Sequence, residues 1–114
     1  RTIIAGSRTA TFDDVQEALS FCPFKDDISV VISGKAKGAD THGETWAKLN
    51  HLPIEEFPAD WSQGKKAGHI RNDAMGERGE ALVAVWDGYS PGTKDMIEIA
   101  TRLGFESFRI SVWE

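Results

Sequence analysis

Short apolar runs rich in β-branched residues alternate along the chain with segments whose apolar residues recur every three or four positions. The runs typical of strands lie at about 2–5, 28–33, 54–57, 81–86 and 107–112. The segments typical of helices lie at about 12–21, 39–50, 64–77 and 93–103. This alternation predicts an α/β fold: a single Rossmann-like domain with an about five-stranded, mostly parallel sheet and helices on both faces.

The kind of hydrophobicity in each strand-like run predicts its place in the sheet. The runs 30–32 and 82–85 are continuously apolar, as expected of central strands that are covered on both faces. The run 108–112 alternates apolar and polar residues, which predicts an edge strand. The first helical segment is predicted to begin after Thr11 as N-cap, with Asp14 completing a capping box, and Gly104 is predicted to stop the last one.

The third helical segment raises a question about one arginine. Ala67, Ile70 and Ala74 are predicted to face inward, and Arg71 lies beside that stripe rather than on the far side of the helix. Its guanidinium is therefore either held by a carboxylate or directed at the phosphate of a ligand. Lys65, near the start of the same segment, belongs either to a ligand site or to a solvated helix start.

Composition fits one soluble domain spanning residues 1–114. A chain of 114 residues buries about two-thirds of its unfolded surface, which is enough for a two-sided sheet. The apolar share of 40% and the charged share of 27% are ordinary, and no apolar run approaches the ~20 residues of a membrane span. The chain begins at Arg1 inside a predicted strand, so we expect further residues upstream. With no charged-then-apolar leader in view, the expected location is cytoplasmic, without membrane contact.

Charge and cysteine content narrow the classes of partner. A net charge of −5 argues against a protein whose main task is to neutralise a nucleic-acid backbone. The single cysteine, Cys22, has no partner for a disulfide and no Cys or His at metal-binding spacing. We therefore expect a small buried hydrophobe at Cys22 and no metal site.

Three strand-like runs end in a glycine-bearing turn that leads into a helix. These turns hold Gly6, Ser7 and Arg8, then 34–40, then 87–93. Because the carboxyl ends of parallel strands share one edge, the turns are predicted to converge there, beside helix N-termini that favour anions. A nucleotide or another phosphate-bearing ligand suits such a site.

The individual residues of these turns leave alternatives open. The turn 33–40 lacks both the GxGxxG pattern and the GK[ST] ending of a P-loop, so Walker-type ATP hydrolysis is not expected. Asp40 is either a helix cap or an acceptor for ribose hydroxyls. Trp61 and Trp86 are either packing residues or platforms on which a base stacks.

Taken together, five motifs with their spacing resemble the YspA/YpsA-related branch of the SLOG superfamily, over nearly the whole chain. They are Ala5-Gly6-Ser7-Arg8, Ser33-Gly34-x-Ala36-x-Gly38-Ala39-Asp40, Phe57-Pro58-Ala59-Asp60-Trp61, Gly64-Lys65-x-Ala67-Gly68-x-x-Arg71-Asn72-x-x-Met75 and Trp86-Asp87-Gly88-x-Ser90-x-Gly92-Thr93. The resemblance implies a small bacterial or phage protein that binds a nucleotide or nucleotide-derived ligand at the carboxyl edge of a Rossmann-like sheet. The residues predicted to bind it are Gly6, Ser7, Arg8, Gly34, Gly38, Ala39, Asp40, Trp61, Lys65, Arg71, Asn72, Asp87, Gly88, Ser90, Gly92 and Thr93.

The superfamily includes proteins with different activities, so the resemblance points to a site rather than to one reaction. A nucleotide sensor or binding domain is the first hypothesis. The alternative is a nucleotide N-glycosidase similar to the LOG phosphoribohydrolases, and a second alternative is single-stranded DNA binding of the DprA type. The catalytic Glu of the LOG motif PGGxGTxxE is replaced here by Met96, so the enzyme hypothesis relies on Asp87 or Asp40 as the carboxylate. Relatives often pair, which implies a homodimer.

Overall fold

The computed structural model describes residues 1–110 of the chain. Five strands form one sheet in which every neighbouring pair is parallel. They are β1 (Thr2–Gly6), β2 (Val31–Ser33), β3 (Ile54–Glu56), β4 (Ala81–Val85) and β5 (Glu106–Ile110). The helices are α1 (Phe12–Phe21), α2 (Ala39–Leu49), α3 (Ala67–Arg78) and α4 (Pro91–Arg102), with short 3₁₀ turns η1 (Lys25–Asp27) and η2 (Trp61–Lys66). The predicted α/β, Rossmann-like fold is confirmed, and the sheet is wholly parallel.

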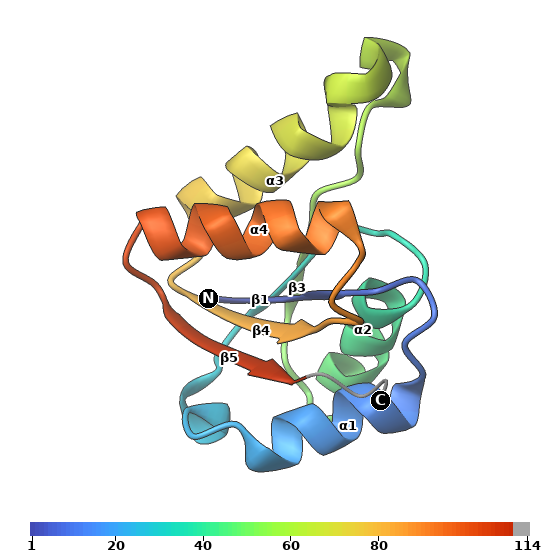
Figure 1. Cartoon of the computed structure of the whole chain (residues 1–114). Coiled ribbons are helices and arrows are strands. Elements are labelled where there is room, and N and C mark those ends of the chain that lie inside the picture. Colours follow the sequence, from blue (N-terminus) through green and yellow to red (C-terminus); the bar gives the residue numbers. More distant parts are fainter. Residues whose placement is uncertain (111–114) are drawn as a thin grey trace.

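The order of the strands across the sheet, β3-β2-β1-β4-β5, reverses direction between β1 and β4. The chain first builds outward from β1 through β2 to β3, and then returns to the other side of β1 for β4 and β5. At such a reversal the loops after two neighbouring strands run to opposite faces and leave a crevice at the carboxyl ends. In Figure 1 these ends point to the right, where the β1–α1 and β4–α4 loops lie.

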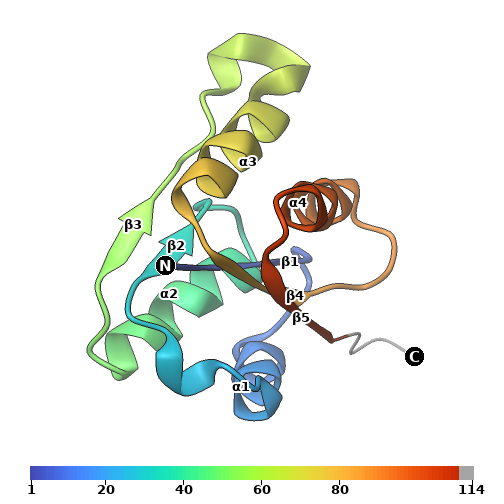
Figure 2. The same cartoon turned by 90° about the vertical axis from the view of Figure 1, so that its left-hand side faces the viewer.

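Two layers of helix cover the sheet, as Figures 1 and 2 show. One face packs Ile4, Val31 and Val83 against α1 and α2. The other packs Ile3 and Leu82 against α3 and α4. Alternate residues of the same strand therefore serve opposite cores, which explains why the central runs read as continuously apolar. As predicted, β2 and β4 are internal strands and β5 is an edge.

Local signals at helix ends behave as the sequence indicates. Thr11 caps α1, and both hydrogen bonds of the capping box to Asp14 are present. Gly104 follows α4 with φ of 75°, a conformation that glycine adopts at little cost. Cys22 is buried, and this burial raises the pKa of its thiol. The predicted small hydrophobe is confirmed.

Three predicted boundaries differ from the structure. The segment 64–77 is not one helix, because Gly64 has φ of 75° and ψ of −147° and separates η2 from α3. The strand predicted at 28–33 is shorter, since the chain around Ile28 is still leaving η1. The strand predicted at 107–112 begins at Glu106, and the part of that prediction beyond Ile110 lies outside the described residues.

The predicted inward face of α3 is confirmed at Ala67, which is 2% exposed, and wrong at Ile70, which is 44% exposed. The buried side of the helix also includes Asn72, Met75 and Gly76. The reason is packing on α4: a Cβ on Gly76 would lie 2.7 Å from Ile99, so the glycine lets the two helices approach closely. This packing turns Arg71 toward the carboxyl edge of the sheet.

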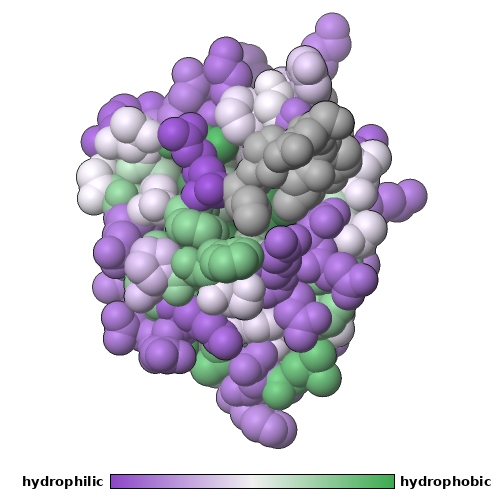
Figure 3. All heavy atoms as spheres, turned by 60° about the horizontal axis from the view of Figure 1, so that its bottom comes forward, coloured by the Kyte–Doolittle hydropathy of each residue, from purple (hydrophilic) through white to green (hydrophobic). Residues whose placement is uncertain are grey.

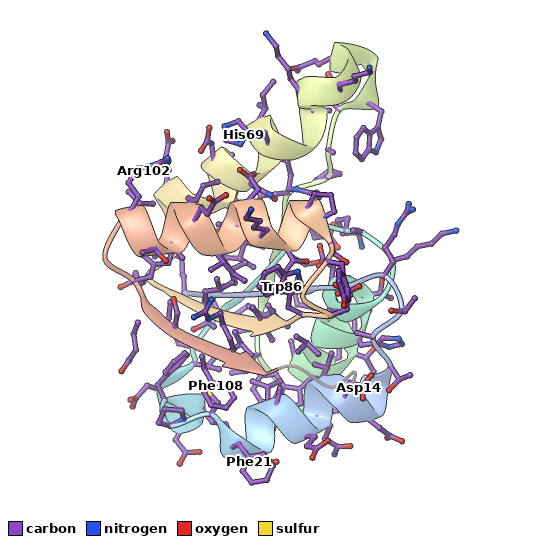
Figure 4. All side chains as sticks on the ribbon, in the orientation of Figure 1. Asp14, Phe21, His69, Trp86, Arg102 and Phe108 are labelled. Carbon is purple, nitrogen blue, oxygen red and sulfur yellow. The ribbon has the colours of Figure 1, made fainter. Side chains whose placement is uncertain are left out.

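The surface on the α1 side is mostly hydrophilic, with hydrophobic residues in separate groups (Figure 3). Phe21 extends away from the body of the molecule there (Figure 4) and is 65% exposed. Across residues 1–110, the helices lack the length and apolar character that crossing a membrane demands.

Candidate functional site

A cavity of about 460 Å³ lies at the carboxyl edge of the sheet, where the strand order reverses between β1 and β4. We call it the switch-point cavity. Its walls come from the end of β1, the β2–α2 turn, η2, α3 and the start of α4. Of the predicted ligand-binding residues, those that line it are Gly6, Arg8, Asp40, Trp61, Arg71, Asn72, Ser90, Gly92 and Thr93.

The N-terminus of α4 presents unused polar groups to this cavity. Ser90 is the N-cap, but its side chain makes no capping bond and instead donates to Asp87. Pro91 has no N–H, and among residues 1–110 the N–H groups of Gly92 and Thr93 have no acceptor. The Thr93 hydroxyl makes no hydrogen bond to the described residues, although Thr93 is only 5% exposed. The helix end is therefore suited to an anion.

Two arginines border the cavity without an ion-pair partner among the described residues. Arg8 is exposed at the start of the β1–α1 loop. Arg71 donates from Nη1 to the Gly34 carbonyl and from Nε to Asn72 Oδ1, at 2.5 and 2.9 Å. The sequence left two roles open for Arg71. No carboxylate among the described residues holds its guanidinium, and part of the guanidinium stays available to a ligand.

Asn72 connects Arg71 to the start of α4. Its amide nitrogen donates to the Gly92 carbonyl at 3.2 Å and to Asp95 Oδ2 at 3.0 Å, while its oxygen accepts from Arg71. Asp95 also contacts His69 Nδ1 at 2.9 Å, which raises the pKa of His69. The network therefore connects α3 to the start of α4: Asn72 lines the cavity, whereas His69 and Asp95 do not, and His69 lies on α3 as labelled in Figure 4.

Asp40 is a buried carboxylate on the cavity wall, 5% exposed. Burial raises its pKa to about 6, and the nearby Arg71 and the N–H of Ala36 offset part of that rise. The Asp40 Oδ2 and Arg71 Nη1 atoms lie 2.8 and 2.7 Å from the point where a Cβ on Gly34 would stand. Only glycine therefore lets the turn pass between these two side chains.

Asp87 has a different environment from Asp40. Its Oδ1 accepts from the N–H groups of Tyr89 and Ser90, both at 2.8 Å. These bonds lower the pKa of Asp87 to about 2. Asp87 does not line the switch-point cavity, and its carboxylate orders the loop before α4.

The remaining predicted residues lie outside the cavity lining and support the loops around it. Ser7 is buried, and its hydroxyl accepts from Asp87 N–H at 3.0 Å. The Ser7 carbonyl accepts from the N–H of Ala39 at 3.2 Å, so that amide is not free for an anion. Gly38 and Gly88 have positive φ, of 84° and 85°.

One lysine and one tryptophan named from the sequence, Lys65 and Trp86, also lie away from the cavity. Lys65 is exposed on η2 and does not line it. Trp86 packs with the core between the sheet and α4, and its Nε1 donates to the Ser90 carbonyl at 3.1 Å. Of the two tryptophans only Trp61, 69% exposed, borders the cavity.

Sequence reasoning missed the apolar part of the lining, which is Ala5, Ala36, Met75, Pro91 and Met96. Helical spacing carried a signal for two of them, because Met75 lies four residues after Arg71 and Met96 lies four after Gly92. Both methionines are almost fully buried and form the floor. Within residues 1–110, no three His, Cys, Asp or Glu side chains gather as metal ligands would.

A second, smaller cavity of about 270 Å³ adjoins the first on the other side of Arg71. Its wall includes Phe57 and Pro58 after β3, together with Ile70 and Ala74 of α3. Arg71 lines both spaces and forms the partition between them.

Comparison with known proteins supports the family that the motifs suggested. No curated protein and no solved structure matches the chain. A family model described as YspA, cpYpsA-related SLOG family matches residues 1–64, which is more than half of the chain. The matched part contains β1, the β2–α2 turn and Trp61. The chain therefore belongs to the YspA, cpYpsA-related SLOG family.

Proposed function

We propose that this protein binds a nucleotide or a nucleotide-derived small molecule in the switch-point cavity, as a sensor or binding domain. One observation carries the proposal. At the reversal of strand order, a cavity is bordered by the uncapped N–H groups of Gly92 and Thr93 and by Arg8 and Arg71, neither of which has an ion-pair partner among residues 1–110. Family membership supports a nucleotide-related role for the chain.

The phosphate of the ligand belongs at the start of α4. A helix N-terminus carries about half a positive charge, and two N–H donors with a threonine hydroxyl match the oxygens of a phosphate. Arg8 and Arg71 supply counter-charge from two other elements. The net charge of −5 does not oppose this, because the attraction is local.

The rest of the cavity suits the organic part of a nucleotide. Its volume of about 460 Å³ is within the usual range for small-molecule sites. The floor of Met75 and Met96 is apolar and adaptable, and Trp61 offers an exposed aromatic face at the rim. An aromatic base fits these surfaces better than a simple inorganic anion does.

A second candidate function, N-glycosidic hydrolysis of a nucleotide, is favoured by one observation: Asp40 is a carboxylate on the cavity wall. A carboxylate at the sugar can orient water or stabilise an oxocarbenium-like state. Two facts weigh against it. Met96 occupies the position of the LOG glutamate, and Asp87 is engaged by its own loop. Incubation with nucleoside monophosphates, followed by chromatography for free base, tests hydrolysis directly.

Isothermal titration calorimetry over mono-, di-, cyclic and ADP-ribose-type nucleotides tests the binding proposal. We expect saturable binding that Arg71→Ala weakens by about tenfold or more, because a charge-assisted hydrogen bond to phosphate is lost. Arg78→Ala is the matched control: Arg78 lies on the same helix but pairs with Glu55 outside both cavities. We expect this control to bind as wild type does.

Three results would contradict the proposal. One is the absence of binding across the whole panel with folded protein. Another is an equal loss of affinity in Arg71→Ala and Arg78→Ala, which would indicate an effect on α3 as a whole. The third is preferred binding of single-stranded DNA with a steep salt dependence, which would favour the DprA-type alternative.

A further inference from the structure

Two acidic residues one turn apart on α2, Asp40 and Glu44, are both buried but are not equally satisfied. Glu44 accepts from the Ser33 hydroxyl at 2.6 Å and from Lys35 Nζ at 3.1 Å, one bond on each oxygen. Glu44 does not line the switch-point cavity. It joins β2, the following turn and α2, and its charge is neutralised within the protein.

Asp40 lacks such partners. Among residues 1–110 no side chain donates to its carboxylate: Oδ2 accepts a long hydrogen bond of 3.4 Å from the N–H of Ala36, and the backbone of Gly34 gives further weak support. It is 5% exposed, and the small accessible part belongs to the wall of the switch-point cavity. Burying a carboxylate with only weak backbone donors is unfavourable, so a further donor would stabilise it.

The surroundings of Asp40 leave room for a hydrogen-bond donor that a ligand could supply. The carboxylate sits in the first turn of α2, and the glycine turn before it leaves no side chain between Asp40 and Arg71. The nearest cation, Arg71, spends two of its N–H donors on Gly34 and Asn72 and forms no ion pair with Asp40. Because Asp40 is buried and lines the switch-point cavity, a ligand in that cavity can bring a hydroxyl or N–H to the carboxylate.

We infer that Asp40 accepts hydrogen bonds from the ribose hydroxyls of the bound nucleotide and makes the site selective for ribonucleotides over 2′-deoxyribonucleotides. This inference rests on the proposed nucleotide function. A carboxylate only accepts, so it repels a phosphate and needs a donor group. The phosphate is drawn to α4 and the base to Trp61 and the methionines, which leaves the sugar, with its neighbouring hydroxyls, for Asp40.

This assignment differs from a simple helix-capping role in what it predicts. A cap stabilises the fold whether or not a ligand is present, and it does not distinguish ligands that differ by one oxygen. A buried acceptor that bonds to a ligand hydroxyl is left without a donor when that hydroxyl is removed, so only the affinity for the deoxy ligand falls. The ratio of two affinities therefore separates the roles.

The experiment is calorimetric titration of ribonucleoside 5′-mono- and diphosphates and their 2′-deoxy counterparts into the wild type and two variants. With wild type, we expect the 2′-deoxy forms to bind about tenfold more weakly, because the deoxy ligand leaves a buried acceptor unpaired. In Asp40→Asn, which offers one acceptor instead of two, this ratio should fall below about threefold. Asp40→Ala should bring it close to one.

Glu44→Gln is the matched control, because it changes an equally buried acid one helical turn away that does not reach the cavity. It should lower thermal stability yet keep the tenfold ratio. Equal binding of ribo- and deoxyribonucleotides by wild type overturns the Asp40 assignment and leaves the nucleotide proposal intact. A ratio that survives in both Asp40 variants overturns it as well. Absence of binding by every nucleotide overturns the proposed function itself.

Discussion

The β2–α2 turn and the β4–α4 loop both end a central strand with an aspartate near a helix start, yet they use that aspartate in opposite ways. In the β4–α4 loop, Asp87 bonds to the backbone of its own loop and has a pKa lowered to about 2. In the β2–α2 turn, Asp40 is buried with a long hydrogen bond from the backbone and a pKa raised to about 6. The Asp87 carboxylate is satisfied by its own loop, whereas the Asp40 carboxylate has only weak backbone donors and lines the switch-point cavity.

The difference comes from where each loop places its glycine. Gly88 stands in open space, so the β4–α4 loop can curl around Asp87 without approaching another element. Gly38 and Gly34 instead pass against Ser7, Arg8 and Arg71, which presses Asp40 into the protein. Two turns of similar composition thus give one self-contained loop and one dependent on its neighbours.

The largest expected effect separates the two glycines. Both have positive φ, but a Cβ on Gly38 would also collide with the carbonyl groups of Ser7 and Arg8. We expect Gly38→Ala to cost about 3 kcal/mol or more, or to prevent folding, while Gly88→Ala costs about 1 kcal/mol from backbone strain alone. Urea denaturation of both variants measures this. Equal losses would show that the β2–α2 turn is no more constrained than the other.

A smaller effect compares the same chemical change at the two carboxylates. At pH 7.5, Asp87→Asn should lower the free energy of unfolding more than Asp40→Asn does, since the hydrogen bonds that the ionised carboxylate accepts from Tyr89 and Ser90 are weakened. Asp40→Asn should change it by less than about 0.5 kcal/mol, because a poorly paired buried charge is removed along with its weak backbone bonds. Denaturation curves provide the test, and a larger loss in Asp40→Asn than in Asp87→Asn would reverse the assignment of roles.

The contrast between the two turns also marks how far the sequence could be interpreted. The order of elements, the central and edge strands and the three converging turns all follow from local patterns that depend on neighbouring residues. Side-chain orientation on α3 did not, because it is set by Gly76 packing on α4, far along the chain. The sequence could not rank the two candidate carboxylates, Asp87 and Asp40, for the same reason. Only tertiary contacts show that Asp87 is bonded to its own loop while Asp40 lines the cavity.

The methionine floor shows the same limit from the apolar side. Met96 is 1% exposed and packs in the core between the sheet and α4. It also lines the switch-point cavity, because the strand-order reversal opens the sheet edge directly beneath the first turn of α4. A pattern of hydrophobic positions predicts which residues are buried, but it does not predict whether they pack in the core or line a cavity.

The smallest expected effect is in how the free energy of unfolding depends on pH. Asp40 has a raised pKa, so the folded state holds its proton more tightly, and the contribution of Asp40 to stability is full below about pH 4 and lost as pH rises through about 6. Between pH 5 and 7 this amounts to about 1 kcal/mol. Asp87 has a lowered pKa, so its contribution is present above about pH 4 and lost as pH falls through about 2.

The measurement is the free energy of unfolding against pH for the wild type and Asp40→Asn, taken as a difference so that His69 and other titrating groups cancel. The difference should decline with rising pH between 5 and 7, and the same subtraction with Asp87→Asn should be flat there and change only below pH 4. If the difference in unfolding free energy between the wild type and Asp40→Asn did not change between pH 5 and 7, Asp40 would already be ionised in the folded protein throughout that range. The β2–α2 turn would then be as self-contained as the β4–α4 loop, and a shortage of donors at Asp40 would no longer distinguish the two.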